Sequence, residues 1–489
     1  MPDSKAQNPT IAFTILALAV ASLTALQSLM APVLPAMQHD LHTTQTGATW
    51  IMSSWLLSAA VATPLVGKAG DMIGRKRAIV VVLALIAIGT LVSALAPNLA
   101  VVLIGRVLQG FGGALSALAF GMLRDIYPAH RVPGAIGLMS SILAIGSGLG
   151  IVLAGPIVSA LDWRWLFWLP MILVVLLTVA AILWLPDAGA RAGGRISLLP
   201  AALLAGWLIA LLLPLSEGSV WGWSSPLTQG LFVLAVVLLV LWIVVETRVA
   251  NPVIDMKLMR MPAVWTTNLV AVLFGAIMFA ILTFLPQLVQ TPRVSGYGLG
   301  LSVTGAGLVI LPMVVGMGVT GPLSARISCR ISFRMQLALT SVISAVATAG
   351  IAFLHGTAVE IALWGLLYGI GLGFAYAALS SLVVQSVPAA QTGVATGMNA
   401  NIRTIGGAIG TAVVASVVTA HVSTTTALPL ERGYVGGFAL LAVFAVVATG
   451  VALLVPRRAG ASADAGSGDA PGEASPAAAL EAELADVAA

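Results

Sequence analysis

Runs of about 20 apolar residues recur along nearly the whole chain, and this feature restricts its fold more than any other. Of the 489 residues, 59% are hydrophobic and 8% are charged, whereas soluble domains carry about 25% charged residues. Each run is long enough to cross a bilayer as a helix. Because a segment in lipid must satisfy its own backbone hydrogen bonds, the runs predict an all-α integral membrane protein.

Fourteen transmembrane helices are expected. They form an N-terminal six-helix bundle over 11–186, two inserted central helices over 196–246 and a C-terminal six-helix bundle over 265–455. The polar stretch 1–10 precedes them, and the acidic tail 459–489, rich in Ala, Gly, Ser and Pro, is expected to be disordered. The expected spans are 11–37, 48–68, 78–97, 99–123, 134–160, 164–186, 196–216, 226–246, 265–290, 298–322, 334–354, 358–385, 393–420 and 433–455.

Lysine and arginine predict how the chain lies in the membrane. Of the 22 basic residues, Arg106 and Arg403 fall inside spans and three fall on one side, so the other seventeen share the side of the N-terminus. Basic loops stay in the cytoplasm, so both termini are expected there, in the cell (inner) membrane. The partner of this basic chain is therefore the lipid bilayer and not nucleic acid. The three basic residues on the far side are Arg164, Arg293 and Arg432.

Two pairs of segments suggest an internal repeat. The segment Pro64–Arg77 after the second span resembles Pro322–Arg334 after the tenth, at an offset of 258 residues. Small residues of the fifth span, from Ala135 to Gly150, recur in the thirteenth at an offset of 260. An even displacement of eight spans gives both copies the same orientation, which is a parallel repeat with the substrate path between two bundles.

Two motifs carry a resemblance to a known family. The stretch from Gly67 to Arg77, with Asp71, Gly74 and Arg75, resembles the loop motif between helices two and three of the major facilitator superfamily. The stretch 103–114, with Arg106, Gln109 and Gly110, is similar to the helix-four motif of its drug:proton antiporters. The arrangement of six, two and six helices is similar to the fourteen-helix branch, the QacA/EmrB-like multidrug efflux transporters. The resemblance covers roughly 11–456.

The resemblance implies roles for these motif residues. The loop motif would act as a conformational latch that holds the outward-facing state, through charges that pair between helix ends or meet helix dipoles. The alternative is that its basic residues only determine topology. Arg106 lies about 12 Å into its span, a depth at which charges usually face a cavity or a partner. The functional interpretation is that Arg106, Gln109 and Gly110 support proton coupling; the alternative is an arginine bonded to carbonyls of a broken helix. The latch residues are Gly67, Asp71, Gly74, Arg75 and Arg77.

The fifth span resembles the helix that seals the bundle in the antiporters, with two departures. Ile151 replaces a proline of that pattern and Ala154 replaces a glycine. Close helix packing is still expected there, because small residues let backbones approach, although ordinary helix packing explains any one glycine equally well. The residues expected to pack closely are Gly146, Gly150, Gly155 and Pro156.

The first span departs further from these exporters. Leu26 stands where they often carry an aspartate, and no carboxylate is expected near the middle of any span. The proton carrier would then be a boundary acid or a histidine such as His39 or His42. With Arg106 and Arg403 inside spans, the cavity should be neutral to positive, which favours neutral or anionic amphiphiles as the small-molecule substrate.

Aromatic and polar residues of several spans are candidates for the substrate cavity. Most such side chains pack between helices or against lipid, which is the competing interpretation. The candidates are Trp55, Phe120, Met139, Phe279, Tyr376, Asn399 and Arg403.

Motifs for other chemistry are missing from the sequence. It has no phosphate-binding loop for ATP, no zinc-protease motif and a single cysteine, so no catalytic residue, metal or cofactor is expected. The preferred interpretation is a monomeric secondary transporter that exports hydrophobic or amphiphilic drugs in exchange for protons. The alternatives are a facilitator-type importer or uniporter of a small metabolite, and a membrane scaffold or sensor without transport.

The expected topology predicts that tags on both ends report the same side. Reporter fusions that fluoresce only in the cytoplasm should be active at the N-terminus and at the C-terminus. A fusion after Arg164, on the predicted far side, serves as the control and should be dark. Tagged ends on opposite faces would contradict the span count.

Overall fold

The computed structural model describes most of the chain, and fourteen of its helices are long and apolar enough to cross a membrane. The predicted number of spans is confirmed, and the protein is a multi-pass membrane protein. The described residues are 9–30, 33–43, 45–128, 131–187, 197–249, 252, 254, 256–328, 330–387, 392–420 and 429–456. The acidic tail predicted over 459–489 lies outside them.

The first bundle departs from the expected spans at two places. The first span ends at Ser28, and residues 34–40 form a separate short helix. The fourth span is interrupted by a 3₁₀ turn that contains Gly112 and Gly113, where any Cβ would press against Leu23 or Thr63 of neighbouring helices. The elements are α1 (Pro9–Ser28), α2 (Leu34–Asp40), α3 (Gln45–Ile73), α4 (Arg75–Ala94), α5 (Leu99–Gly110), η2 (Phe111–Ala114), α6 (Leu115–Ile126), α7 (Val132–Ala160) and α8 (Trp165–Trp184).

The inserted pair consists of α9 (Leu198–Trp221) and α10 (Pro226–Glu246), which pack on each other through Trp207 and Trp242. The second bundle follows. Its elements are α11 (Met256–Met259), α12 (Pro262–Gln290), η3 (Arg293–Ser295), α13 (Val303–Ile327), α14 (Phe333–Phe353), α15 (Ala358–Ser386), α16 (Thr392–Thr419) and α17 (Glu431–Ala452).

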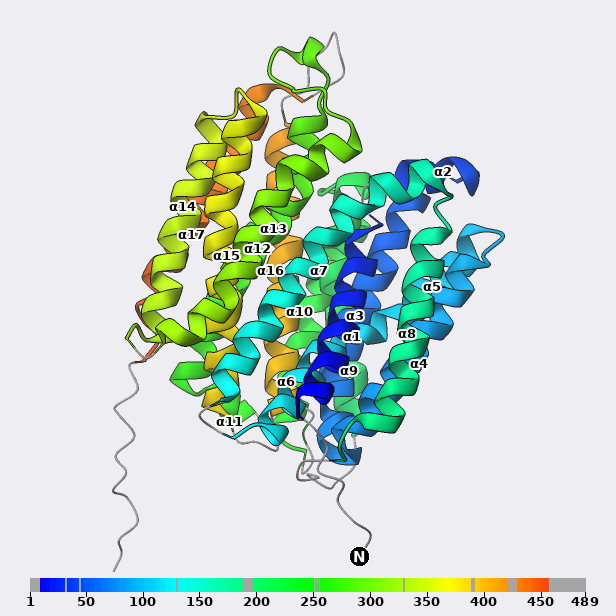
Figure 1. Ribbon diagram of the computed structural model, residues 1–489, viewed down its shortest axis with the longest axis vertical. Helices are drawn as coiled ribbons and strands as arrows, with labels where there is room; N and C mark the ends of the chain where they lie inside the picture. Colours follow the sequence, from blue (N-terminus) through cyan, green and yellow to red (C-terminus); the bar gives the residue numbers. More distant parts are fainter. Residues whose placement is uncertain are drawn as a thin grey trace, which may run out of the picture. The chain divides into compact units, whose positions relative to one another are not determined.

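Helices α7 and α13 lie side by side where the two bundles meet (Figure 1). A Cβ on Gly321 of α13 would overlap the hydroxyl of Ser141 and lie 2.8 Å from the carbonyl oxygen of Gly137 on α7. On another face of α7, a Cβ at Gly146 or Gly150 would lie 2.5–2.9 Å from carbonyl oxygens of α1. Glycines therefore bring α7 into backbone contact with both bundles, as membrane helices do when lipid supplies no hydrophobic driving force.

The helix bundle has a basic end and a far end. The basic end is the one where α3 and α6 end and α4 and α16 begin, and the lysine and arginine count predicts that it faces the cytoplasm. The far end is the opposite one, where α5 begins and α9 ends. Each bundle has its own apolar core, and the cores are joined by α7, α13 and the helices around α16.

A valine at Gly321 should destabilise the protein by about 1–3 kcal/mol, because it overpacks the contact between α7 and α13. The measurement is the melting temperature of the detergent-purified protein. Gly230→Val on α10 is the matched control, since nothing lies within 4 Å of its Cβ position. Equal melting temperatures for the two variants would contradict the packing described.

Candidate functional site

A buried cluster of charges ties α3, α4 and α6 together at the basic end. The Arg75 guanidinium donates to Asp71 at 2.9 Å, to Asp125 and to the carbonyl oxygen of Gly121 at 3.1 Å. All three charged side chains are buried. A Cβ at Gly121 would lie 2.5 Å from Arg75 Nε, so the glycine makes room for the arginine. A buried guanidinium is tolerated when hydrogen-bonded carboxylates surround it in this way.

The same cluster reaches the second bundle. The Oδ2 atom of Asp71 accepts the backbone N–H of Val394 at 3.3 Å, in the first turn of α16. The positive end of a helix dipole stabilises a carboxylate there. Arg124 of α6 also crosses between bundles, donating at 2.8 Å each to Val384 O, Val387 O and Thr392 Oγ1. Charge-assisted hydrogen bonds therefore hold the bundles together at the basic end.

The other residues of the predicted latch have different surroundings. Gly74 joins α3 to α4 with φ at 102°, a conformation that favours glycine. Gly67 is buried on α3, while Arg77 is exposed at the basic end. Asp71 and Arg75 therefore belong to one hydrogen-bonded network. Arg77 lies outside it, exposed at the basic end.

Arg106 is fully buried in the first bundle, with none of its surface exposed. Its Nε donates to the carbonyl oxygen of Ile51 on α3 at 2.9 Å, and its Nη1 donates to Gln109 at 2.8 Å. Gln109 in turn donates to Ser93 on α4 at 3.3 Å. Trp55 lies with its ring centre 5.9 Å from the guanidinium carbon. The Nη2 atom has no hydrogen-bond partner among the described residues. The carbonyl group that Arg106 contacts belongs to α3, which is continuous at Ile51. The span that contains Arg106 is itself interrupted after Gly110 by the 3₁₀ turn.

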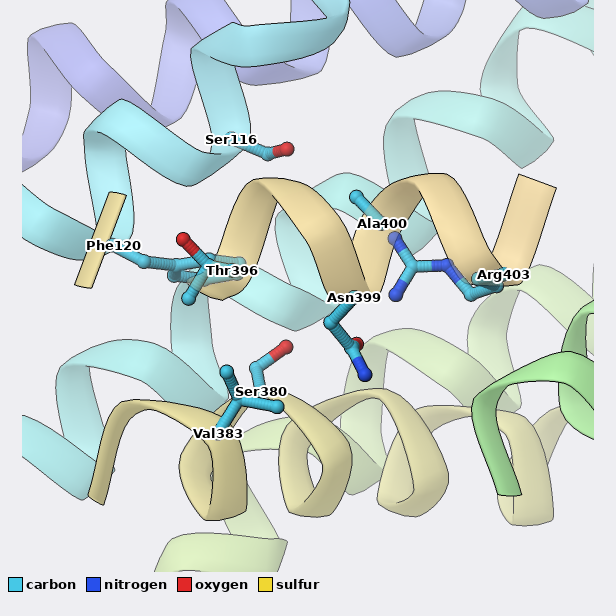
Figure 2. A pocket seen from close by; sticks show the side chains of 8 residues that line it. All are labelled: Ser116, Phe120, Ser380, Val383, Thr396, Asn399, Ala400 and Arg403. Atoms are coloured by element: carbon cyan, nitrogen blue, oxygen red, sulfur yellow. The ribbon is translucent and has the colours of Figure 1, made fainter. Parts of the chain in front are cut away.

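A pocket lies between the two bundles, where α6 of the first meets α15 and the first half of α16 of the second (Figure 2). The cavity volume is about 10 Å³, which is room for about one water molecule and far below the 300–1,000 Å³ usual for drug-sized ligands. Figure 2 shows the Arg403 guanidinium running along α16 toward Asn399, with α6 on one side and α15 on the other. The lining residues are Ser116, Phe120, Ser380, Val383, Thr396, Asn399, Ala400 and Arg403.

Arg403 is positioned by close contacts within the second bundle. A Cβ at Gly275 of α12 would overlap the Arg403 carbonyl oxygen, so this glycine lets α12 lie directly on α16. The Tyr376 ring centre lies 4.7 Å from the guanidinium carbon, and Phe274 packs edge-on against Tyr376 at 5.5 Å. No described carboxylate lies within 4.0 Å of Arg403. The guanidinium of Arg403 therefore faces the Tyr376 ring and the pocket.

The predicted cavity residues divide into two groups. Phe120, Asn399 and Arg403 line the pocket, and Tyr376 contacts Arg403 from beside it. The other three candidates do not line this pocket. Met139 is in the core of the first bundle and Trp55 is beside Arg106. Phe279 packs against Gly407 of α16.

Several polar residues of the site gave no recognisable signal in the sequence. Ser116, Ser380 and Thr396 line the pocket, but single hydroxyl residues occur in most membrane helices. Arg124 and Asp125 appeared only as charges at a helix end. Their partners are distant in the sequence, so only the tertiary structure reveals them.

Two of the boundary groups considered as proton carriers, His39 and Asp40, lie on α2 and are exposed. His39 is exposed at the far end, 3.5 Å from Asp40. The indole of Trp163 donates to Asp40 at 2.8 Å, and this hydrogen bond lowers the pKa of Asp40 from its ordinary value. The fifth-span residues Gly146, Gly150, Gly155 and Pro156 all lie on α7, where Gly155 faces Thr304 at the start of α13.

The fold and the pocket between bundles are those of a membrane transporter. A family model described as Major Facilitator Superfamily matches residues 16–195 and 188–411, and these matches span most of the chain. The protein therefore belongs to the major facilitator superfamily.

Curated relatives include resistance proteins. The tetracenomycin C resistance and export protein of Streptomyces glaucescens is 28% identical over 84% of this chain and 76% of its own length. Multidrug resistance protein 3 of Bacillus subtilis is 25% identical over 76% of this chain and 72% of its own. Among solved structures, the human organic anion transporter MFSD10 (TETRAN) superposes with a TM-score of 0.68 at 17% identity, covering 91% of this chain and all of that one. This last similarity shows the fold.

Replacing Asp71 by Asn should loosen the basic end, because the α16 N-terminus loses its anion and Arg75 loses one of its carboxylates. A hydrogen bond to a charged group contributes about 1.5–3 kcal/mol, so access to the pocket should rise roughly tenfold or more. The measurement is the labelling rate of Thr396→Cys, in a Cys329→Ser background, by a membrane-impermeant thiol reagent added to inverted vesicles.

Arg77→Gln is the matched control, since this exposed basic residue of the same motif is outside the buried cluster. Its labelling rate should equal that of the parent. An unchanged rate in Asp71→Asn would show that Asp71 does not hold the bundles together.

Proposed function

We propose that the protein exports hydrophobic or amphiphilic compounds across the cell (inner) membrane in exchange for protons, as a monomer with both termini in the cytoplasm. Family membership and relatives whose names refer to multidrug resistance and export support this function. Alternating access follows from the two bundles, which rock about the pocket between them.

The observation that carries the substrate preference is the charge in the pocket. Arg403 contributes a guanidinium that is balanced by no described carboxylate, within reach of the pocket's hydroxyl and amide groups. Phe120 and Val383 supply apolar surface beside it. A ligand with an apolar body and an anionic or hydrogen-bonding head matches this lining, whereas a lipophilic cation meets a like charge. Neutral and anionic amphiphiles are therefore the proposed substrates.

The basic-end contacts support a role in the cycle. Asp71 and Arg124 bridge the bundles through α15 and α16, so these hydrogen bonds must break before the pocket can open toward the basic end. With that end in the cytoplasm, the described state is closed to the cytoplasm. The Asp71 network is thus the proposed latch of the outward-facing state.

Replacing Arg403 by Gln should raise the apparent KM for an anionic substrate about tenfold or more, because a charge-assisted hydrogen bond is lost. The probe is tritiated taurocholate, whose sulfonate stays charged at every working pH, and the measurement is its uptake into energised inverted vesicles. Transport of an uncharged amphiphile such as methyl cholate should change far less. Arg432→Gln, an exposed arginine at the far end, is the control.

A pH-sensitive dye in the same vesicles tests proton exchange. Addition of a transported compound should dissipate the proton gradient if the carrier is an antiporter. Strong efflux of ethidium with no effect on neutral or anionic compounds would overturn the proposed preference. Downhill movement without any proton flux would favour the facilitator alternative.

A further inference from the structure

The inserted helix α9 contacts both bundles. Leu212 of α9 packs with Ala60 of α3 and Ala408 of α16 in one apolar cluster. Leu204, Trp207 and Leu208 continue this contact toward Val394 near the start of α16. Helix α9 therefore packs on α3 and α16, which also contact each other through the hydrogen bond from Asn401 to the Ala60 carbonyl, so a change in the position of α3 relative to α16 alters the surface on which α9 packs.

Glu217 lies on this helix and is fully buried, with none of its surface exposed. The hydroxyl of Ser53 on α3 donates to its Oε1 at 2.9 Å. Its Oε2 has no hydrogen-bond partner among the described residues. The sequence placed Glu217 beyond the seventh span, but α9 continues to Trp221, so the carboxyl group lies within the helix, about 6 Å before its end. Glu217 therefore belongs to a membrane-spanning helix, near its far end and not near its middle.

Among the residues that the structure describes, no charged group of the helices packed on α9 lies near Glu217 along the helix axes. On α3, Lys68 and Asp71 lie at the basic end, at least about 22 Å along the helix from Ser53. On α10 the charged residue is Glu246, also at the basic end, and on α16 it is Arg403, about 24 Å before the end of that helix. On α2, His39 and Asp40 are exposed and lie 3.5 Å from each other, and Asp40 also accepts from Trp163.

The segment of α3 that contacts Glu217 also contacts Arg106. Arg106 donates to the Ile51 carbonyl and Ser53 donates to Glu217, within one turn of the same helix. Within the described part of the chain, each of these two groups has one polar atom without a hydrogen-bond partner, Nη2 in Arg106 and Oε2 in Glu217. Buried ionisable residues inside membrane spans mark ion and proton pathways.

We propose that Glu217 is a proton-binding site of the transport cycle, contributed by the inserted helix α9 and oriented by Ser53 of α3. The inference rests on the proposed proton antiport. A proton enters at Oε2 and gives the neutral acid, while Oε1 keeps the hydrogen bond from Ser53. Release of that proton restores the carboxylate. The site supplies the membrane-embedded acid that is missing at Leu26 in the first span.

Infrared difference spectroscopy tests proton binding directly, without any transported compound. Wild-type protein in proteoliposomes, titrated with acid, should show the C=O stretch of a buried protonated carboxyl, at a higher frequency than hydrated acids. Glu217→Gln should lack this band. Asp162→Asn removes an exposed carboxylate at the same end and should retain it. Ser53→Ala keeps the carboxyl and removes its hydrogen bond, so the band should remain with a shifted pH midpoint. The same titrating band in Glu217→Gln would overturn the proposal.

A transport assay places the site in the cycle. In proteoliposomes, Glu217→Gln should keep taurocholate exchange at equal pH within about twofold of wild type. Its accumulation of taurocholate driven by a pH gradient should fall at least tenfold. Undiminished gradient-driven accumulation would overturn the proposal. If wild type itself shows no gradient-driven transport, the proposed antiport fails, and the infrared band alone then decides whether Glu217 binds a proton.

Discussion

Lipid offers no hydrogen-bond partners, and this constraint governs every polar group inside the helices. The backbone satisfies it by forming helices throughout the spans. Buried charged side chains satisfy it with one another or with carbonyl groups of neighbouring helices. Arg75 has two carboxylates and the Gly121 carbonyl, while Arg106 has the Ile51 carbonyl and Gln109. Arg403, which faces an aromatic ring and the pocket, and Glu217, whose Oε2 has no partner among the described residues, are the places where a ligand and a proton are proposed to bind.

The contacts between bundles are of two physical kinds. Near α7 and α13 they are glycine contacts, in which short backbone separations give dispersion forces without charge. At the basic end they are hydrogen bonds from Arg124 and to Asp71, which depend on charge and geometry. Small residues allow two packed surfaces to slide or rock, whereas the charged contacts are either formed or broken. An interface with both kinds is suited to two discrete states.

Much of the fold could be predicted from local patterns. Span number follows from the length of the apolar runs, and the motif residues Asp71 and Arg75 are only four positions apart in the chain, on either side of Gly74. The predicted cavity residues do not all lie together, since Met139 is in the core of the first bundle and Trp55 is beside Arg106. An aromatic or methionine in a membrane helix has the same local pattern whether it faces a cavity, another helix or lipid. Glu217 was placed outside its span because hydropathy marks the end of an apolar run and not the end of the helix.

The sequence by itself determined that the chain spans a membrane fourteen times, because helix length and hydropathy are local properties that need no knowledge of neighbours. Only the tertiary structure decided that Asp125 completes the Arg75 cluster, that Arg124 bridges to α15 and α16, and that Ser53 meets Glu217. These partners are separated by 50 to 268 positions in the chain. Their pairing depends on how helices pack side by side, and no pattern along a single helix encodes that arrangement.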